Sequence, residues 1–293
     1  MRSILLKSIA VSLVALVLVL GCGRNEKEKQ LSDFIQSHVE KIKPLMKEAN
    51  LAYWNAATTG NEKDYDKYSE LELKIRQIYS NKDDFAFLKE LKESGRIKDK
   101  KLARQLEVLY NSYLENQIEP ELLKQIVELG TEVEKKFSTF RGKIRGKTVT
   151  NNEIEEILKT ETDSRKRKEA WLASKQVGSV VADDLIKLVK LRNQAARKLG
   201  FDNYHTMSLT TGEQKVQELD KIFNELYDLT NEPFARVKAE LDSILADKYG
   251  VGVAGLMPWH YHDPFFQESP LVYDLDLDAY YKDKDVKELA AKF

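Results

Sequence analysis

The chain has 293 residues, of which 42% are hydrophobic and 32% are charged, with a formal net charge of -1. That length suits one large domain or two ordinary ones, and the hydrophobic share is enough for a sizeable core. Because the charges nearly cancel, the composition gives no reason to expect nucleic acid as a partner, which would favour a basic face. The single cysteine, Cys22, excludes an internal disulfide and a cysteine-rich zinc motif.

The first residues have the pattern of a secretory signal. A positive start at Arg2 and Lys7 is followed by an apolar run over residues 9–20, which is shorter than the ~20 apolar residues of a membrane-spanning helix. Residues 19–22, Val19-Leu20-Gly21-Cys22, resemble a bacterial lipobox. In a lipobox the cysteine is lipidated on its thiol, and this cysteine becomes the new N-terminus. We therefore expect a signal peptide over residues 1–21 and lipidation at Cys22.

Charged residues begin directly after the cysteine, so residues 22–30 are expected to form a solvated, lipidated tether. The alternatives are an ordinary signal peptide or an N-terminal membrane anchor. Either reading places the remainder of the chain outside the cytoplasm. The lipobox reading predicts a lipoprotein of the cell envelope that is anchored to the membrane and faces the periplasm or the outside.

Residues 31–293 are predicted to be helical almost throughout, because apolar residues recur at three- and four-residue steps. Pro44 is expected to kink the first helix and Pro233 to start the second of two late helices. A hairpin-like connection is predicted over 142–150, where two glycines accompany β-favouring residues. Helices are predicted over 31–57, 62–79, 84–94, 102–113, 120–137, 152–160, 163–199, 213–232, 233–249 and from 275 onward. The fold class is all-α, a layered helical half-shell.

The histidines exclude one common form of zinc chemistry. In His-Glu-x-x-His on a helix, two imidazoles one turn apart bind zinc and the glutamate acts as general base. None of the four histidines of this chain is followed by glutamate, and no two are four residues apart; they are His38, His205, His260 and His262. A zinc site built on that motif is therefore excluded within these 293 residues, and no catalytic residue is predicted.

Residues 250–270 form a loop in which proline, glycine, histidine and aromatic residues crowd together. Its centre is His260-Tyr261-His262. On a strand the two rings would share a face and bind a metal ion, but no third ligand is evident. The favoured interpretation is that both histidines line a cleft through hydrogen bonds and stacking.

Four stretches of the sequence belong together: Ala-Tyr-Trp-Asn-Ala-Ala-Thr-Thr-Gly at 52–60, Ala-Arg-Gln-Leu at 103–106 with Leu-Tyr-Asn at 109–111, Leu-Val-Lys-Leu-Arg-Asn-Gln-Ala-Ala at 188–196 with Leu-Gly-Phe at 199–201, and Met-Pro-Trp-His-Tyr-His-Asp-Pro-Phe-Phe at 257–266. Taken in this order, they resemble one family, the angiotensin-converting-enzyme-like peptidyl-dipeptidases, and more closely its bacterial lipoprotein members.

The resemblance implies a helical fold of two halves that flank a deep groove with zinc at its floor. The first helices would form a lid over the groove, and Trp54 and Asn55 fall on a lid helix by this match. His260 stands where the family holds a glutamine for the C-terminal carboxylate of the substrate. Trp259 would pack against a substrate side chain or belong to the core. The candidate groove residues are Trp54, Asn55, Trp259, His260 and His262.

The resemblance also implies the activity, the release of dipeptides from peptide C-termini by a zinc enzyme. No cofactor is expected in this chain, and zinc is expected for the full-length family. We expect the helical domain to be truncated at its C-terminal end, inactive alone, and completed by a C-terminal half. The alternatives are a non-catalytic helical lipoprotein that binds peptides or proteins, and a structural protein of the periplasm.

Overall fold

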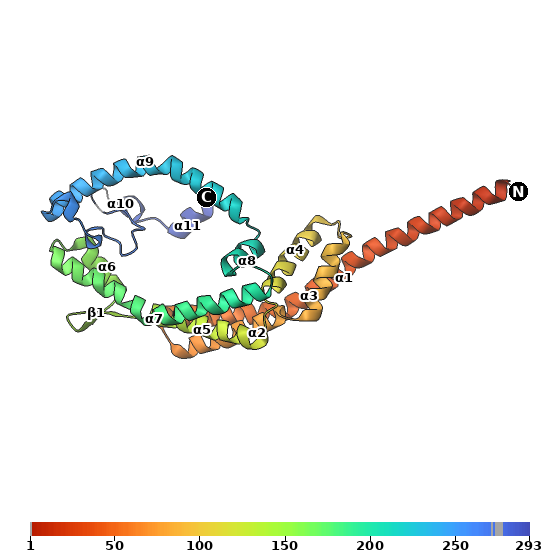
Figure 1. Ribbon diagram of the computed structural model, residues 1–293, viewed down its shortest axis with the longest axis horizontal. Coiled ribbons are helices and arrows are strands. Elements are labelled where there is room, and N and C mark those ends of the chain that lie inside the picture. Colours follow the sequence, from red (N-terminus) through yellow and green to blue (C-terminus); the bar gives the residue numbers. More distant parts are fainter. Residues whose placement is uncertain (1, 271, 273–277) are drawn as a thin grey trace. The chain divides into compact units, whose positions relative to one another are not determined.

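The structure is a computed structural model that describes residues 2–270, 272 and 278–293, with side chains from Glu26 onward except that of Asp278. It is almost entirely helical (Figure 1), and among the described residues the one sheet is a two-stranded hairpin. The fold class predicted from the sequence, all-α, is therefore confirmed. The chain divides into two compact units, residues 1–139 with 180–222 and residues 140–179 with 223–293.

Unit 1 is built from long helices joined by short turns. It comprises α1 (Arg2–Thr59), α2 (Glu62–Tyr79), α3 (Lys82–Ser94), α4 (Lys100–Glu115), α5 (Pro120–Thr139), the second half of α7 (Ser164–Lys198), α8 (Tyr204–Thr211) and the start of α9 (Val216–Tyr249). Asparagine or aspartate side chains cap α2, α3 and α4 by accepting backbone N–H bonds, and Gly95 ends α3 with a φ of 61°.

The apolar stripe of α1 forms two parts of the core of unit 1. Near its start, Leu31 is completely buried against residues of α3 and α4, namely Leu88, Leu91, Leu106 and Tyr113. Further along, α1 packs against α2 through Ile42, Ala49, Ala52, Leu71 and Ile75. The helix continues through Pro44, because a proline removes one intrahelical hydrogen bond and the flanking turns keep theirs.

The segment predicted as a tether already contacts unit 1 near its end. Lys27 forms an ion pair with Glu90, and a carboxylate oxygen of Glu28 accepts the backbone N–H groups of Lys98 and Asp99 at 2.7 and 3.0 Å. Cys22 lies in the part of α1 whose side chains the structure does not describe, so its lipidation stays a prediction. None of the helices in the described part of the chain combines the length and apolar character that crossing a membrane requires.

Unit 2 includes the first half of α7. It contains β1 (Gly142–Ile144), β2 (Lys147–Val149), α6 (Asn151–Thr160), most of α9, the 3-10 turns η1 (Val253–Gly255) and η2 (Pro258–His260), and the short helices α10 (Asp278–Tyr281) and α11 (Val286–Lys292). Its core holds Ile154, Leu158, Ala170 and Ala173, against which Trp171 and Trp259 pack.

The predicted hairpin is present in unit 2. Its strands pair antiparallel from Gly142 opposite Val149 to Ile144 opposite Lys147. Arg145 and Gly146 turn the chain with φ angles of 50° and 80°, the signature of a type I′ turn. Gly142 is required for packing, since a Cβ there would lie 2.7 Å from the carbonyl oxygen of Ala173.

Two boundaries near the C-terminus differ from the prediction. Pro233 does not start a new helix, because α9 runs unbroken from Val216 to Tyr249 with the proline inside it. The proline removes only the hydrogen bond to the carbonyl of Leu229, four residues earlier, and the turns on both sides hold the helix. The helix predicted from residue 275 onward begins partly outside the described residues, and the chain there forms the two short helices α10 and α11.

Candidate functional site

The aromatic and histidine residues of the loop at 257–266 lie in unit 2, beside the N-terminus of α7. The ring of His260 is 1% exposed. Its Nδ1 atom accepts the backbone N–H of Met257 at 2.8 Å, and its Nε2 atom lies 2.8 Å from Oγ of Ser164. Because Nδ1 is an acceptor, a neutral ring carries its proton on Nε2 and donates it to Ser164.

The tautomer of His260 determines whether His260 and Ser164 can act as a base and its nucleophile. Oγ of Ser164 also accepts the indole N–H of Trp259 at 3.1 Å. A serine nucleophile needs a histidine whose free Nε2 can accept the hydroxyl proton. His260 is a donor to Ser164 instead, so the pair fixes the loop on α7 and does not form a catalytic dyad.

Arg167, a residue that sequence reasoning missed, is the centre of this region. Its side chain is fully buried, with Nε donating to the carbonyl of Trp259 at 2.7 Å and Nη1 to the carbonyl of Glu161 at 2.9 Å. The guanidinium lies 4.7 Å from the ring centroid of Tyr249, which in turn lies 4.9 Å from that of His260. Arg167 therefore joins α7, α9 and the loop.

Burial and positive charge keep the histidines of the loop neutral. The pKa of His260 is lowered by burial and, secondly, by the charge of Arg167. The pKa of His262, a side chain only 2% exposed, is lowered to about 4, first by burial and then by Lys248, Arg167 and Lys159. A neutral ring offers a carboxylate only a hydrogen bond, and the one N–H of His260 is already donated to Ser164.

Further bonds fasten the rest of the loop. The hydroxyl of Tyr261 donates to Asp242 of α9 at 2.7 Å, and Lys238 lies 2.6 Å from the same carboxylate. Lys175 of α7 donates to the carbonyl of Pro264 at 2.6 Å. The segment is thus a packed part of unit 2, tied to both long helices.

The residues that the structure describes do not fit a zinc ion. Zinc takes three or four nitrogen, sulfur or oxygen ligands at about 2.0 to 2.3 Å. No group of three histidine, cysteine or acidic residues comes together in the described part of the chain. Both nitrogens of His260 are occupied, Nδ1 of His38 lies 3.1 Å from the hydroxyl of Tyr113, and positive charges surround His262. We therefore derive no chemical step through zinc.

The other two predicted groove residues belong to unit 1. Trp54 and Asn55 lie near the end of α1, where Trp54 is 67% exposed and the carbonyl of Asn55 accepts the hydroxyl of Thr59 at 2.6 Å. The structure thus brings Trp259, His260 and His262 together in one unit and holds Trp54 and Asn55 in the other. That any of the five contacts a substrate stays a prediction.

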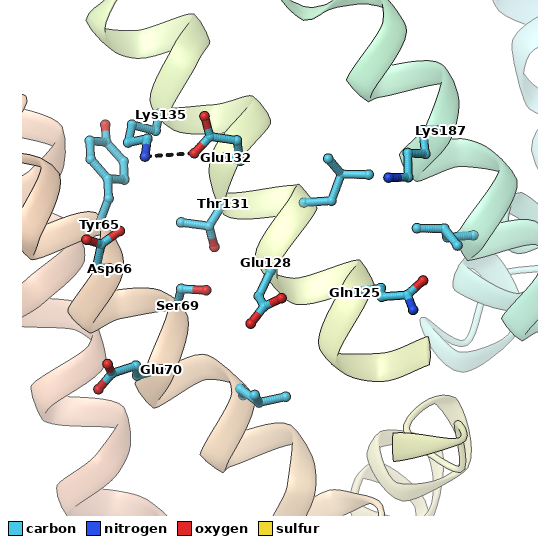
Figure 2. A pocket seen from close by; sticks show the side chains of 13 residues that line it. Tyr65, Asp66, Ser69, Glu70, Gln125, Glu128, Thr131, Glu132, Lys135 and Lys187 are labelled. Atoms are coloured by element: carbon cyan, nitrogen blue, oxygen red, sulfur yellow. Dashed lines mark ion pairs between the residues drawn. The ribbon is translucent and has the colours of Figure 1, made fainter. Parts of the chain in front are cut away.

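Unit 1 also contains a hollow of about 560 Å³ between α2, α5 and α7, which Figure 2 shows from close by. Its charged lining is mostly acidic, although Lys135 forms an ion pair with Glu132 at 2.7 Å and Lys187 stands on the α7 side. The carboxylates are those of Asp66, Glu70, Glu128 and Glu132. No histidine or cysteine lines the hollow, and no group of three acidic, histidine or cysteine residues comes together in the described part of the chain.

Comparison with known proteins places the chain in a family. The sequence model of a family described as angiotensin-converting enzyme matches residues 25–262, which is more than half of the chain. The chain belongs to this peptidase family. A search among curated proteins finds no match.

The matched range covers the groove residues predicted for this member of the angiotensin-converting-enzyme family. It starts three residues after Cys22 and ends at His262, so it includes all five predicted groove residues. It supports a peptidase-like function in general, and the family depends on zinc in general.

Proposed function

We propose that this chain provides a peptide-binding wall of a zinc peptidyl-dipeptidase and that these 293 residues bind peptides without cutting them. The proposal rests on a mismatch between the family match and the histidines of this chain. The family match extends over most of the chain, yet none of its four histidines is followed by glutamate or paired at the spacing of a zinc motif. A peptide carbonyl would not be polarised, because the ligands for the metal that does so are lacking.

The surface of α9 supports a binding role. Along its first two thirds this helix exposes large apolar side chains, which at 100° per residue fall within about half of its circumference and so share one broad face. Contiguous exposed apolar surface usually marks a site where a protein or ligand binds. The side chains, each between 47% and 72% exposed, are Ile222, Phe223, Leu226, Tyr227, Leu229, Phe234 and Val237.

The test combines metal analysis with a cleavage assay on the full chain in detergent. We expect no stoichiometric zinc after purification and no release of dipeptides from an internally quenched peptide. Zinc-dependent cleavage that persists through rigorous purification and is removed by a chelator would contradict the proposal. Binding of the same peptide sequence, labelled with the fluorophore and without the quencher, should saturate when followed by fluorescence anisotropy, and a flat titration would refute the binding role.

A second arm distinguishes the catalytic family role from a non-catalytic binding lipoprotein. A separately produced polypeptide that carries His-Glu-x-x-His and the following helices of a family member is added to the chain. Zinc-dependent cleavage that appears only in the mixture supports a complementing half. Peptide binding by a cooperatively melting monomer, with no cleavage in the mixture, supports the non-catalytic alternative.

The proposed membrane anchor is tested separately. We propose that the thiol of Cys22 is lipidated and holds the protein at the cell envelope, on the basis of the sequence Val19-Leu20-Gly21-Cys22. Incorporation of labelled palmitate should be abolished by Cys22→Ser. Label that persists in this variant, or a protein that leaves the membrane fraction at high salt in its unsubstituted form, would contradict the anchor.

A further inference from the structure

A second, smaller hollow in unit 1 has the features of a ligand site. Its volume is about 180 Å³, below the roughly 300 to 1,000 Å³ of pockets for drug-sized ligands. It lies on α5 and is also lined by α2, the end of α4, the last turns of α7, and α8. Apolar side chains of the lining include those of Ile126, Ala195 and Met207. The site would therefore accept a small ligand with some apolar surface.

Arg192 supplies this hollow with a positive charge that no carboxylate neutralises. The other arginine of the lining, Arg76, is held by Glu72 at 2.7 Å. Arg192 forms no ion pair with any residue that the structure describes, and its guanidinium lies 5.1 Å from the ring centroid of Tyr204. A planar guanidinium backed by an aromatic ring is well suited to receive a carboxylate through two parallel hydrogen bonds.

Gly130 of α5 lies beneath the guanidinium of Arg192. A Cβ at Gly130 would be 3.9 Å from Nη2 of Arg192, so the charge lies directly above the glycine. Glu134 follows one turn later on the same face, about 6 Å along the helix axis. Its carboxylate lies near the hydroxyl of Tyr53, whose pKa it raises, and it forms no ion pair with Arg192 or any other residue that the structure describes. The two opposite charges therefore lie apart on one side of the hollow.

A second carboxylate completes the lining. Glu115, at the end of α4, accepts the hydroxyl of Thr211 at 3.1 Å and forms no ion pair among the described residues. A ligand that is only an anion would face Glu115 and Glu134, and a ligand that is only a cation would face Arg192. A ligand with both charges a few ångströms apart satisfies the whole set.

We infer that this hollow binds a small zwitterion, a free α-amino acid or a dipeptide, with its carboxylate on Arg192 and its ammonium group near Glu134 and Glu115. The inference rests on the geometry of unit 1 alone and is independent of the proposed peptide-binding role. The apolar side chains around the charges would contact the ligand side chain.

The experiment measures binding by isothermal titration calorimetry on the full chain in detergent. The probes are L-leucine and the dipeptide Ala-Leu, each with two analogues that lack one charge, an N-acetylated form and a C-terminal amide. At least one zwitterion should bind, and each missing charge should weaken binding roughly 10- to 100-fold. Equal binding of a zwitterion and its amide, or no binding of any probe at millimolar concentration, would overturn the inference.

Variants locate the site. Arg192→Gln and Glu134→Gln should each weaken binding by the same roughly 10- to 100-fold, and Gly130→Leu should abolish it by filling the hollow. Arg104→Gln is the control, because Arg104 pairs with Glu213 outside the hollow. Circular dichroism verifies that each variant folds. Unchanged binding in folded Arg192→Gln would refute the assignment.

Discussion

Nε of Arg167 donates a 2.7 Å hydrogen bond to the carbonyl oxygen of Trp259, 92 residues further along the chain. The same guanidinium bonds the carbonyl of Glu161 and covers the ring of Tyr249. One buried side chain thus connects the start of α7, the end of α9 and the loop that was predicted to face the substrate. This connection makes the loop a structural element of unit 2.

Replacement of Arg167 should therefore weaken unit 2 selectively. Arg167→Ala leaves two partly buried carbonyls without their donor and removes a large buried side chain, so we expect a loss of about 3 kcal/mol in the free energy of unfolding. Tryptophan fluorescence during urea unfolding measures it, in a Trp54→Phe background where Trp171 and Trp259 report on unit 2. Arg165→Ala, which removes an exposed arginine two residues away, is the control; equal losses in both variants would contradict the role of Arg167.

His262 should make the stability of unit 2 depend on pH. Its pKa falls from 6.5 to about 4 on folding, so its contribution is complete above the unfolded value of 6.5 and is lost as the pH falls through this window towards 4. The shift corresponds to at most about 3 kcal/mol.

Urea unfolding across this pH window tests the sign. The wild-type chain should become less stable as the pH falls, and His262→Gln should flatten that dependence although it also lowers stability at neutral pH. His205→Gln, at an exposed position of unit 1, serves as the control. A wild-type chain that gains stability between 6.5 and 4, or an unchanged slope in His262→Gln, would contradict the prediction.

The sequence predicts most of the architecture because local signals determine it. The periodic apolar residues of 163–199 give α7, and the glycines of 142–150 give the hairpin. The same local reasoning predicts a helix start at Pro233, and this prediction is wrong because α9 tolerates the loss of one hydrogen bond. Helices and turns are thus predictable where a strong apolar periodicity ends at a glycine or proline that does interrupt the helix.

The candidate site is less predictable, because contacts between distant segments determine it. Within Ser-Arg-Lys-Arg-Lys-Glu, at 164–169, every charge suggests a solvated face, yet Arg167 is buried. The sequence feature that could have indicated the burial of Arg167 is its position one turn before Trp171, on the face that α7 turns towards the core. The hydrogen bond between His260 and Ser164 joins residues 96 positions apart, and no local sequence pattern predicts it.

Two glycines should respond oppositely to alanine. Gly178 lies inside α7 with no atom near the place of a Cβ, so Gly178→Ala should stabilise the chain by about 0.5 to 1 kcal/mol. At Gly142 a Cβ would lie 2.7 Å from the carbonyl oxygen of Ala173, so Gly142→Ala should destabilise unit 2 by about 1 to 3 kcal/mol. Thermal unfolding followed by circular dichroism compares them, and a stabilised Gly142→Ala would refute the packing argument.

Ser164 should matter through its two acceptor bonds and through no chemistry of its own. Ser164→Ala leaves the N–H groups of His260 and Trp259 without an acceptor in a buried region, so we expect a loss of about 2 to 3 kcal/mol and altered tryptophan emission. The matched control is Ser174→Ala, whose hydroxyl bonds only the carbonyl of Trp171 on the same helix. If the pair were a nucleophile and its base, a fluorophosphonate would label Ser164. We expect no labelling, and label on Ser164 would show that the tautomer deduced for His260 is wrong.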